Sequence, residues 1–94
     1  MRLRYQSRAL RQIEVALTYI ASESPQGAAK VEARISAALL LVKSFPLSGH
    51  KTPVSGVRRM YLTPFPYHID YFVGRDEIVV QRFRHSARRP LATD

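Results

Sequence analysis

The chain has 94 residues, 46% hydrophobic and 23% charged, which argues against disorder and leaves room for one core. It has no cysteine, so disulfides and thiolate zinc sites are excluded, and its longest apolar run, residues 37–42, cannot span a bilayer. Fifteen basic residues against seven acidic ones give a net charge of +8, which should attract phosphates, anionic membranes or acidic proteins.

The N-terminal segment predicts a strand followed by a helix. RLRYQS alternates Leu3 and Tyr5 with polar residues, which is typical of a short strand with one wet face. The charges in this segment also take the place of the apolar region that a secretory signal needs, so we expect a soluble, cytoplasmic protein. Ser7 is a candidate N-cap for a helix over residues 8–22. Its apolar stripe should be Leu10, Ile13, Leu17 and Ile20.

A second helix should begin at Ser24 and Pro25, because serine caps a helix and proline is tolerated at its first position. It should run to about residue 44 and end at Phe45 and Pro46. Its buried stripe should be Val31, Ile35, Ala38, Leu39 and Val42. The short turn between the helices predicts an antiparallel helical hairpin. Residues 46–56, with two prolines and two glycines, predict a loop.

Three strands should follow, at residues 57–63, 67–73 and 77–84, because aromatic and β-branched residues enrich all three segments. The predicted order is therefore β-α-α-β-β-β over one domain, residues 1–94. We expect an α+β fold in which the helical hairpin packs on one face of an antiparallel sheet. The other face of the sheet would stay open for function.

Side-chain alternation assigns residues to these two faces. In YHIDYFV, Tyr67, Ile69, Tyr71 and Val73 should face the core, so His68 and Asp70 should look out from the open face. Met60 and Leu62 should point inward, which places Arg59 and Tyr61 outside and Arg58 near the rim. In EIVVQRFR, either Val79 and Phe83 pack inward, or Ile78 and Val80 do, in which case Arg82 and Arg84 must sit beyond the core or a bulge must switch the phase.

If Val79 and Phe83 pack inward, arginines gather with a histidine on the open face. This group would contain Arg59, His68, Arg82 and Arg84, with His85, Arg88 and Arg89 at its edge. Such a surface suits phosphates, bases or partner carboxylates. Like charge would lower the pKa of His68 and leave a neutral imidazole able to act as a base, although a histidine on a sheet is more often structural.

The sequence gives little support for a metal site, a phosphate-binding loop or a nucleophilic active site. The histidines at 50, 68 and 85 lack the close spacing of a metal site, and the chain has no Gly-rich phosphate loop and no nucleophile elbow. We therefore expect no metal and no cofactor.

Three segments together resemble the RelE/ParE superfamily of bacterial toxins from type II toxin–antitoxin modules. They are ALRQIEVALTYIASESPQGAAKVEARISAALLLVKSFPLSG, then GVRRMYLTPFPYHIDYFV, then EIVVQRFRHSARRP. The resemblance spans nearly the whole chain, and the fold that it implies is the one predicted above. In this superfamily, RelE-like members cut messenger RNA in the ribosomal A site, whereas ParE-like members poison DNA gyrase.

The ending with histidine and arginine is more similar to the ParE-like branch. RelE-like toxins often carry an arginine where this chain has His68, and they commonly carry a late tyrosine, whereas no tyrosine follows Tyr71 here. The resemblance therefore implies a gyrase inhibitor rather than an enzyme, with a target-contacting surface of Arg58, Arg59, Arg82, Arg84, His85, Arg88 and Arg89. The alternative is a ribosome-dependent ribonuclease that uses His68 or His85 with Arg59, Arg82 and Arg88.

The resemblance also implies a cognate, ParD-like antitoxin in a hetero-oligomeric complex. An acidic and amphipathic segment of this antitoxin would wrap the toxin, and the positive charge of the chain would speed the association. Apolar grooves along the helical hairpin would supply most of the affinity.

Overall fold

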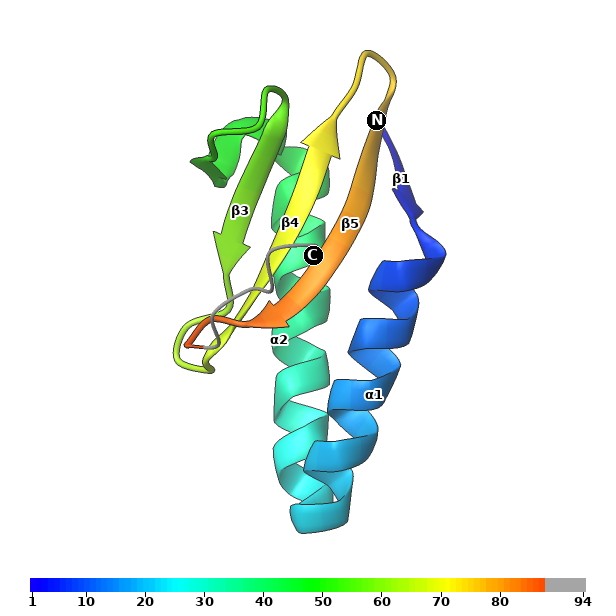
Figure 1. Cartoon of the computed structure of the whole chain (residues 1–94), viewed down its shortest axis with the longest axis vertical. Coiled ribbons are helices and arrows are strands. Elements are labelled where there is room, and N and C mark those ends of the chain that lie inside the picture. Colours follow the sequence, from blue (N-terminus) through cyan, green and yellow to red (C-terminus); the bar gives the residue numbers. More distant parts are fainter. Residues whose placement is uncertain (88–94) are drawn as a thin grey trace.

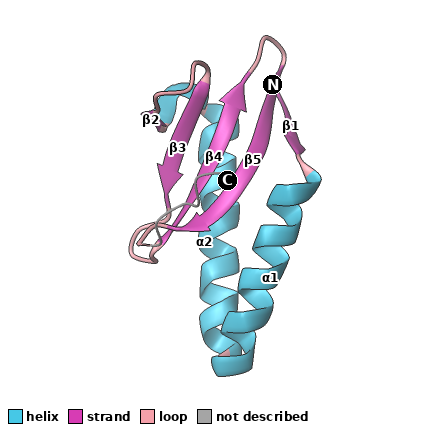
Figure 2. Ribbon diagram, in the orientation of Figure 1, coloured by secondary structure: helices cyan, strands magenta, loops and turns pink. Residues whose placement is uncertain are grey.

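A computed structural model describes residues 1–87, which form a helical layer and a sheet layer (Figures 1 and 2). The elements are β1 (Arg2–Tyr5), α1 (Ser7–Glu23), α2 (Pro25–Ser44), the 3-10 turn η1 (Pro46–Ser48), β2 (His50–Lys51), β3 (Val57–Tyr61), β4 (Tyr67–Val73) and β5 (Glu77–His85). Both helices lie on one side of the sheet (Figure 1). Within residues 1–87, neither helix combines the length and apolar character that a membrane crossing requires.

The predicted fold class is confirmed, with two differences in the sheet. The strand order is β1-β5-β4-β3-β2, and β1 pairs with β5 in parallel while the other pairs are antiparallel. The parallel pair arises because the helical hairpin returns the chain to the end where β1 began, and two further reversals bring β5 back to that direction. The predicted loop over residues 46–56 also contains η1 and the short edge strand β2.

The first helix begins one residue before the predicted start. Its N-cap is Gln6, which makes no side-chain capping bond, so the prediction of Ser7 as the cap was wrong. Leu10 is 51% exposed, while the neighbouring Ala9 is fully buried. The rest of the predicted stripe, Ile13, Leu17 and Ile20, packs against the core. Leu10 therefore lies at the flank of the buried face, one position away from its centre.

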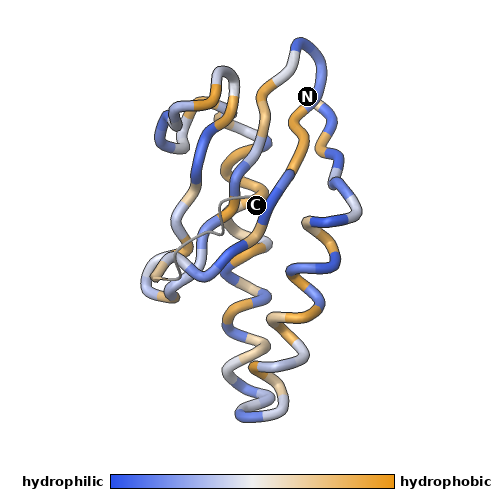
Figure 3. The backbone as a smooth tube through the Cα atoms, viewed as in Figure 1, coloured by the Kyte–Doolittle hydropathy of each residue, from blue (hydrophilic) through white to orange (hydrophobic). Residues whose placement is uncertain are grey.

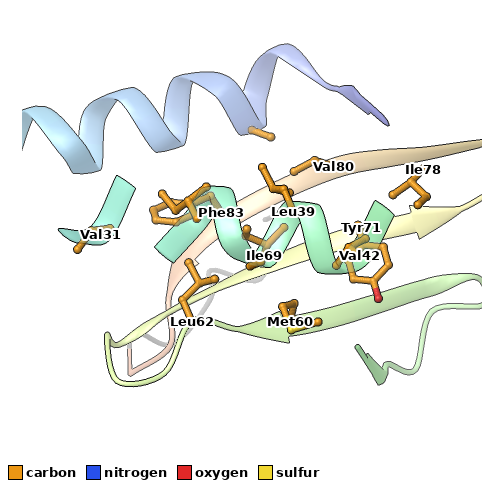
Figure 4. Close-up of a cluster of buried hydrophobic side chains, with 13 residues drawn as sticks. Val31, Leu39, Val42, Met60, Leu62, Ile69, Tyr71, Ile78, Val80 and Phe83 are labelled. Carbon is orange, nitrogen blue, oxygen red and sulfur yellow. The ribbon is translucent and has the colours of Figure 1, made fainter. Parts of the chain in front are cut away.

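The second helix follows the prediction closely. The Ser24 hydroxyl accepts a hydrogen bond from the Gly27 amide at 2.9 Å, and Pro25 occupies the first turn. Phe45 is the C-cap. All five residues of the predicted stripe are buried: Val31, Ile35, Ala38, Leu39 and Val42. Apolar side chains from β3, β4 and β5 complete this core from the sheet side (Figure 4).

A bulge in β5 decides which of its residues enter the core. Asp70 of β4 lies opposite Arg82, but the next residue, Tyr71, lies opposite Val80, so Gln81 has no partner in the β4 ladder. The phase of β5 switches there, and Ile78, Val80 and Phe83 all face the core. The second alternative from the sequence is therefore correct.

The amide of Phe83, just beyond the bulge, donates a 2.8 Å hydrogen bond to the Gln12 side chain of α1. Because β1 pairs only with residues 77–80 of β5, a helix side chain takes over where the parallel ladder has ended.

A buried tyrosine fixes the turn between α2 and the sheet. The Tyr71 hydroxyl donates to the Pro46 carbonyl at 2.7 Å and accepts from the Gly49 amide at 2.9 Å. A Cβ atom at Gly49 would lie 2.6 Å from this hydroxyl, so only glycine fits the close approach. Tyr71 of the central strand therefore ties both ends of this turn, which leads into β2, to the sheet.

We expect Tyr71→Phe to lower the free energy of unfolding by roughly 2–4 kcal/mol, because it leaves a buried carbonyl and a buried amide without their partner. Urea denaturation followed by circular dichroism would measure this change. Tyr19→Phe is the matched control, since Tyr19 is 66% exposed on α1 and its change should stay within about 0.5 kcal/mol. A Tyr71→Phe variant as stable as the control would contradict this role of the hydroxyl.

Candidate functional site

The open face of the sheet, on the side that the helices leave uncovered, carries two rows of polar and aromatic residues. Residues that lie opposite each other on neighbouring strands share a face. One row joins Tyr61 of β3, His68 of β4 and Arg84 of β5, and the next joins Arg59, Asp70 and Arg82. We call these six residues the open-face cluster.

Arg59 and Asp70 form a two-point ion pair in this cluster. The Arg59 Nε and Nη2 atoms donate to the two carboxylate oxygens of Asp70 at 2.8 and 3.1 Å. The hydrogen bond with Asp70 raises the pKa of Arg59 above its ordinary value. The Asp70 side chain is 9% exposed and that of Arg59 is 35% exposed. The carboxylate is thus almost enclosed, while part of the Arg59 side chain still reaches solvent.

His68 is buried, although we expected it to look outward. Its residue is 6% exposed, and its Nδ1 atom lies 3.1 Å from the Ser86 hydroxyl. Its Nε2 atom is buried and has no hydrogen-bond partner within residues 1–87. Burial lowers the pKa of His68 below its ordinary value, and the charges of Arg59 and Arg84 act in the same direction, against Asp70.

Asp70, which we also expected to look outward, is 6% exposed. Both residues are therefore buried on a face that alternation alone would leave open.

An aromatic row crosses the edge of the open face. His50 of β2 contacts the ring of Tyr61 at a centroid distance of 5.5 Å, and Tyr61 contacts His68 at 5.8 Å, both edge-on. Tyr61 is 42% exposed and His50 is exposed as well. Sequence reasoning missed His50, since it lies in a segment that reads as a loop and only the pairing of β2 with β3 places it beside Tyr61.

The predicted target-contacting residues divide between the two faces. Arg59, Arg82 and Arg84 lie together on the open face. Arg58 lies on the other side at the rim, where its guanidinium donates to the Leu47 and Gly49 carbonyls at 3.2 and 2.9 Å.

His85 lies opposite Tyr67, with ring centroids 5.3 Å apart, on the face of the helices. Alternation keeps it on the opposite face from Arg82 and Arg84, and the bulge turns that face toward the helices. The predicted residues Arg88 and Arg89 lie outside the described residues. Within residues 1–87, no three histidine, aspartate or glutamate side chains come together as a metal site would require.

The helical hairpin offers a second surface, of apolar character. Its far half extends beyond the sheet (Figure 1), and hydrophobic segments recur along both helices (Figure 3). A shallow groove of about 360 Å³ lies between the helices there, lined by Leu17, Thr18, Ala21, Pro25, Ala28, Ala29 and Glu32. At the other end of α2, four large apolar residues are exposed: Leu40, Leu41, Phe45 and Leu47.

We expect the free energy of unfolding to fall as the pH drops below about 6.5, because the unfolded chain then binds a proton that buried His68 resists. Because the pKa of His68 is lower in the folded state than in the unfolded state, its contribution to the free energy of unfolding is complete above about pH 6.5 and is lost at lower pH. Urea denaturation between about pH 8 and pH 5 would measure it. In His68→Asn, the free energy of unfolding should depend less on pH. Each value is compared with the stability of the same variant at pH 8. An unchanged slope in the variant would contradict this assignment.

Comparisons with known proteins agree with the fold and extend it. Residues 3–90 match the family model described as the ParE toxin of the type II toxin–antitoxin system parDE. The chain is 35% identical over 85 residues to the Sinorhizobium fredii (strain NBRC 101917 / NGR234) protein named "Putative toxin Y4kP", covering 89% of this chain and 88% of that protein.

A solved structure of the chromosomal ParDE system from P. aeruginosa has the same fold, with a TM-score of 0.77 and 22% identity. The similarity covers 90% of this chain and 95% of that chain. The family match over most of the sequence, together with the two-layer fold, leads to one conclusion. The chain belongs to the ParE family of toxins from type II toxin–antitoxin systems.

Proposed function

We propose that this toxin inhibits DNA gyrase in the bacterial cytoplasm, and that the open-face cluster contacts the gyrase–DNA complex. The observation that carries the proposal is the joining of Arg59, Arg82 and Arg84 on one face beside exposed Tyr61. Arginine and tyrosine are the residues that most often dominate protein interfaces, and arginine also binds phosphate. The family match supports a toxin but leaves its target to be proposed.

The geometry favours a binding surface over a ribonuclease site. A catalytic base must come within hydrogen-bond reach of the proton that it abstracts. The Nε2 atom of His68 is enclosed and its Nδ1 atom already contacts Ser86, while Asp70 compensates the charge of Arg59. His85, the other histidine of the ribonuclease alternative, lies on the face of the helices. Arg59, His68 and Arg82 share the open face, but neither histidine of the ribonuclease alternative offers a reachable ring nitrogen there.

We expect Arg82→Gln/Arg84→Gln to lose most of the gyrase inhibition of the wild-type toxin, because it removes two charges from the contacting face. A DNA supercoiling assay with purified gyrase would measure inhibition. The matched control is Arg8→Gln/Arg11→Gln, which removes the same charge from exposed positions on α1. The control should inhibit as the wild type does.

The cellular readout distinguishes the two targets. After induction without antitoxin, thymidine incorporation should fall before methionine incorporation if gyrase is inhibited. Methionine incorporation that falls first would overturn the proposal and point to the ribosome. If the Arg82→Gln/Arg84→Gln variant still inhibits gyrase fully, the open face does not contact gyrase, although gyrase remains the target.

We also propose that a cognate antitoxin neutralises this toxin by laying an acidic, amphipathic segment on the helical hairpin. The groove between α1 and α2 and the exposed apolar residues of α2 provide the apolar surface. The charge of the chain supports an acidic partner, because no aspartate or glutamate occurs between Glu32 and Asp70. Apolar contact would supply affinity, and the opposite charges would speed encounter.

We expect Ala29→Glu to weaken antitoxin binding about tenfold or more, since it places a larger, charged side chain in the groove and repels an acidic segment. Isothermal titration calorimetry with the purified antitoxin would measure the affinity. Ala33→Glu is the matched control, with the same substitution at an exposed position of α2 outside the groove lining. Equal affinities of the two variants would exclude the groove as the binding surface.

A further inference from the structure

We propose that the open face binds single-stranded nucleic acid, with bases stacked on exposed aromatic rings and phosphates held by the arginines between them. This inference deepens the proposed function and rests on it for its toxic consequence, since the strand would belong to the gyrase–DNA complex. The binding itself can be measured without gyrase.

The exposed ring of Tyr61 is held in place for stacking. Tyr61 is 42% exposed, yet two flanking imidazoles contact it, His50 at 5.5 Å and His68 at 5.8 Å. These edge-on contacts limit the positions that the ring can adopt, at interplanar angles of 64° and 62°. A ring that is already held in place loses little conformational entropy when a base stacks on it.

Aromatic and charged groups alternate along β4 and its neighbouring strands. Phe72, 37% exposed, lies on the same face as His68, four residues further along β4, which corresponds to about 13 Å. The row of Arg59, Asp70 and Arg82 lies between these two aromatic positions. An exposed ring, a row of guanidinium groups and a second exposed ring thus follow one another. A nucleic acid strand presents the matching alternation of bases and phosphates.

The charge of the open face also suits a phosphate ligand. The open-face cluster contains three arginines and one aspartate, so its net charge is positive. Asp70 does more than neutralise Arg59, because its two oxygens accept from Nε and Nη2 and fix the orientation of the guanidinium, while 35% of the Arg59 side chain stays exposed. An oriented guanidinium suits phosphate, whose oxygens accept paired hydrogen bonds.

The shape of the surface selects single strands over a duplex. Bases within a duplex are stacked on one another, so Tyr61 and Phe72 could stack only with unpaired bases. Reading a duplex would instead require an element that enters a groove. No helix projects from the open face within residues 1–87, where both helices pack on the opposite side of the sheet (Figure 1).

Fluorescence anisotropy with the full-length protein tests this site. The probes are labelled oligothymidylate and oligouridylate of about a dozen nucleotides, and a mixed-sequence DNA duplex of the same length. We expect both single strands to bind more tightly than the duplex, and oligothymidylate to bind at least as tightly as oligouridylate. Tighter binding of oligouridylate would overturn DNA of the gyrase complex as the natural strand. Tyr61→Leu, which keeps an apolar side chain at this position, should weaken single-strand binding by roughly tenfold. Tyr19→Leu on exposed α1 is the matched control and should bind as the wild type does.

The salt dependence tests the phosphate contacts separately. Arg84→Gln should reduce the slope of log affinity against log salt by about 0.7, the value of one phosphate contact on a single strand. Arg11→Gln, exposed on α1, should leave the slope unchanged. Equal affinity for duplex and single strands, or a Tyr61→Leu variant that matches the Tyr19→Leu control, would overturn the stacking site and leave only general attraction to polyanions.

The gyrase assay separates this inference from the proposed function. If Tyr61→Leu loses strand binding and still inhibits gyrase fully, strand binding has no part in inhibition, and the gyrase proposal survives alone. If the wild-type toxin binds single strands but does not inhibit gyrase, the gyrase proposal fails and the nucleic-acid site stands. Loss of strand binding and of inhibition in the same variant supports both.

Discussion

The register shift between β4 and β5 is the constraint on which the rest of the structure depends. A regular β5 would place Arg82 on the same face as Ile78 and Val80, against the helices. Burying an unpaired guanidinium there would cost several kcal/mol. The extra residue, Gln81, lets Ile78, Val80 and Phe83 share the core and turns Arg82 and Arg84 to the other side.

The bulge interrupts the hydrogen-bond ladder between β4 and β5. A side chain of α1 supplies a hydrogen bond to β5 beside the bulge. Gln12 of α1 accepts from the Phe83 amide, so this backbone donor stays satisfied beyond the end of the β1 ladder. The same bulge also directs His85 toward Tyr67 on the helix side. One inserted residue therefore determines which charged groups meet on the open face and which do not.

His68 and Asp70 lie on the open face but are buried, whereas Tyr61 and Phe72 on the same face are exposed and 35% of the Arg59 side chain reaches solvent. Catalysis by a histidine needs a reachable ring nitrogen, which the buried Nε2 atom of His68 does not offer. His50, at the edge of this face, is exposed.

The two layers also separate the two proposed partners. The apolar groove and the exposed end of α2 belong to the helical layer, and the arginines and rings belong to the uncovered side of the sheet. Because the sheet lies between them, an antitoxin on the hairpin and a target on the open face would touch different side chains. Neutralisation would then depend on bulk, on charge or on a segment that reaches around the edge of the sheet.

The sequence by itself determined the elements and the core of the helices, because those depend on local chemistry. Ser24 and Pro25 set the start of α2, and the spacing of Val31, Ile35, Ala38, Leu39 and Val42 defined its buried face without reference to any other segment. Alternation likewise placed Met60, Leu62, Ile69 and Tyr71 correctly. The assignment to the toxin superfamily was equally available from the order of these segments.

Only the tertiary structure decided the phase of β5, the direction of β1 and the burial of His68 and Asp70. Each depends on pairing between residues far apart in the chain, which a local pattern does not record. A bulge changes every later side chain by one face, so Arg82 and His85 could not be assigned from EIVVQRFR alone. The edge strand at His50 and Lys51 is too short to show alternation, and it exists because β3 and the Tyr71 hydroxyl hold that turn in place.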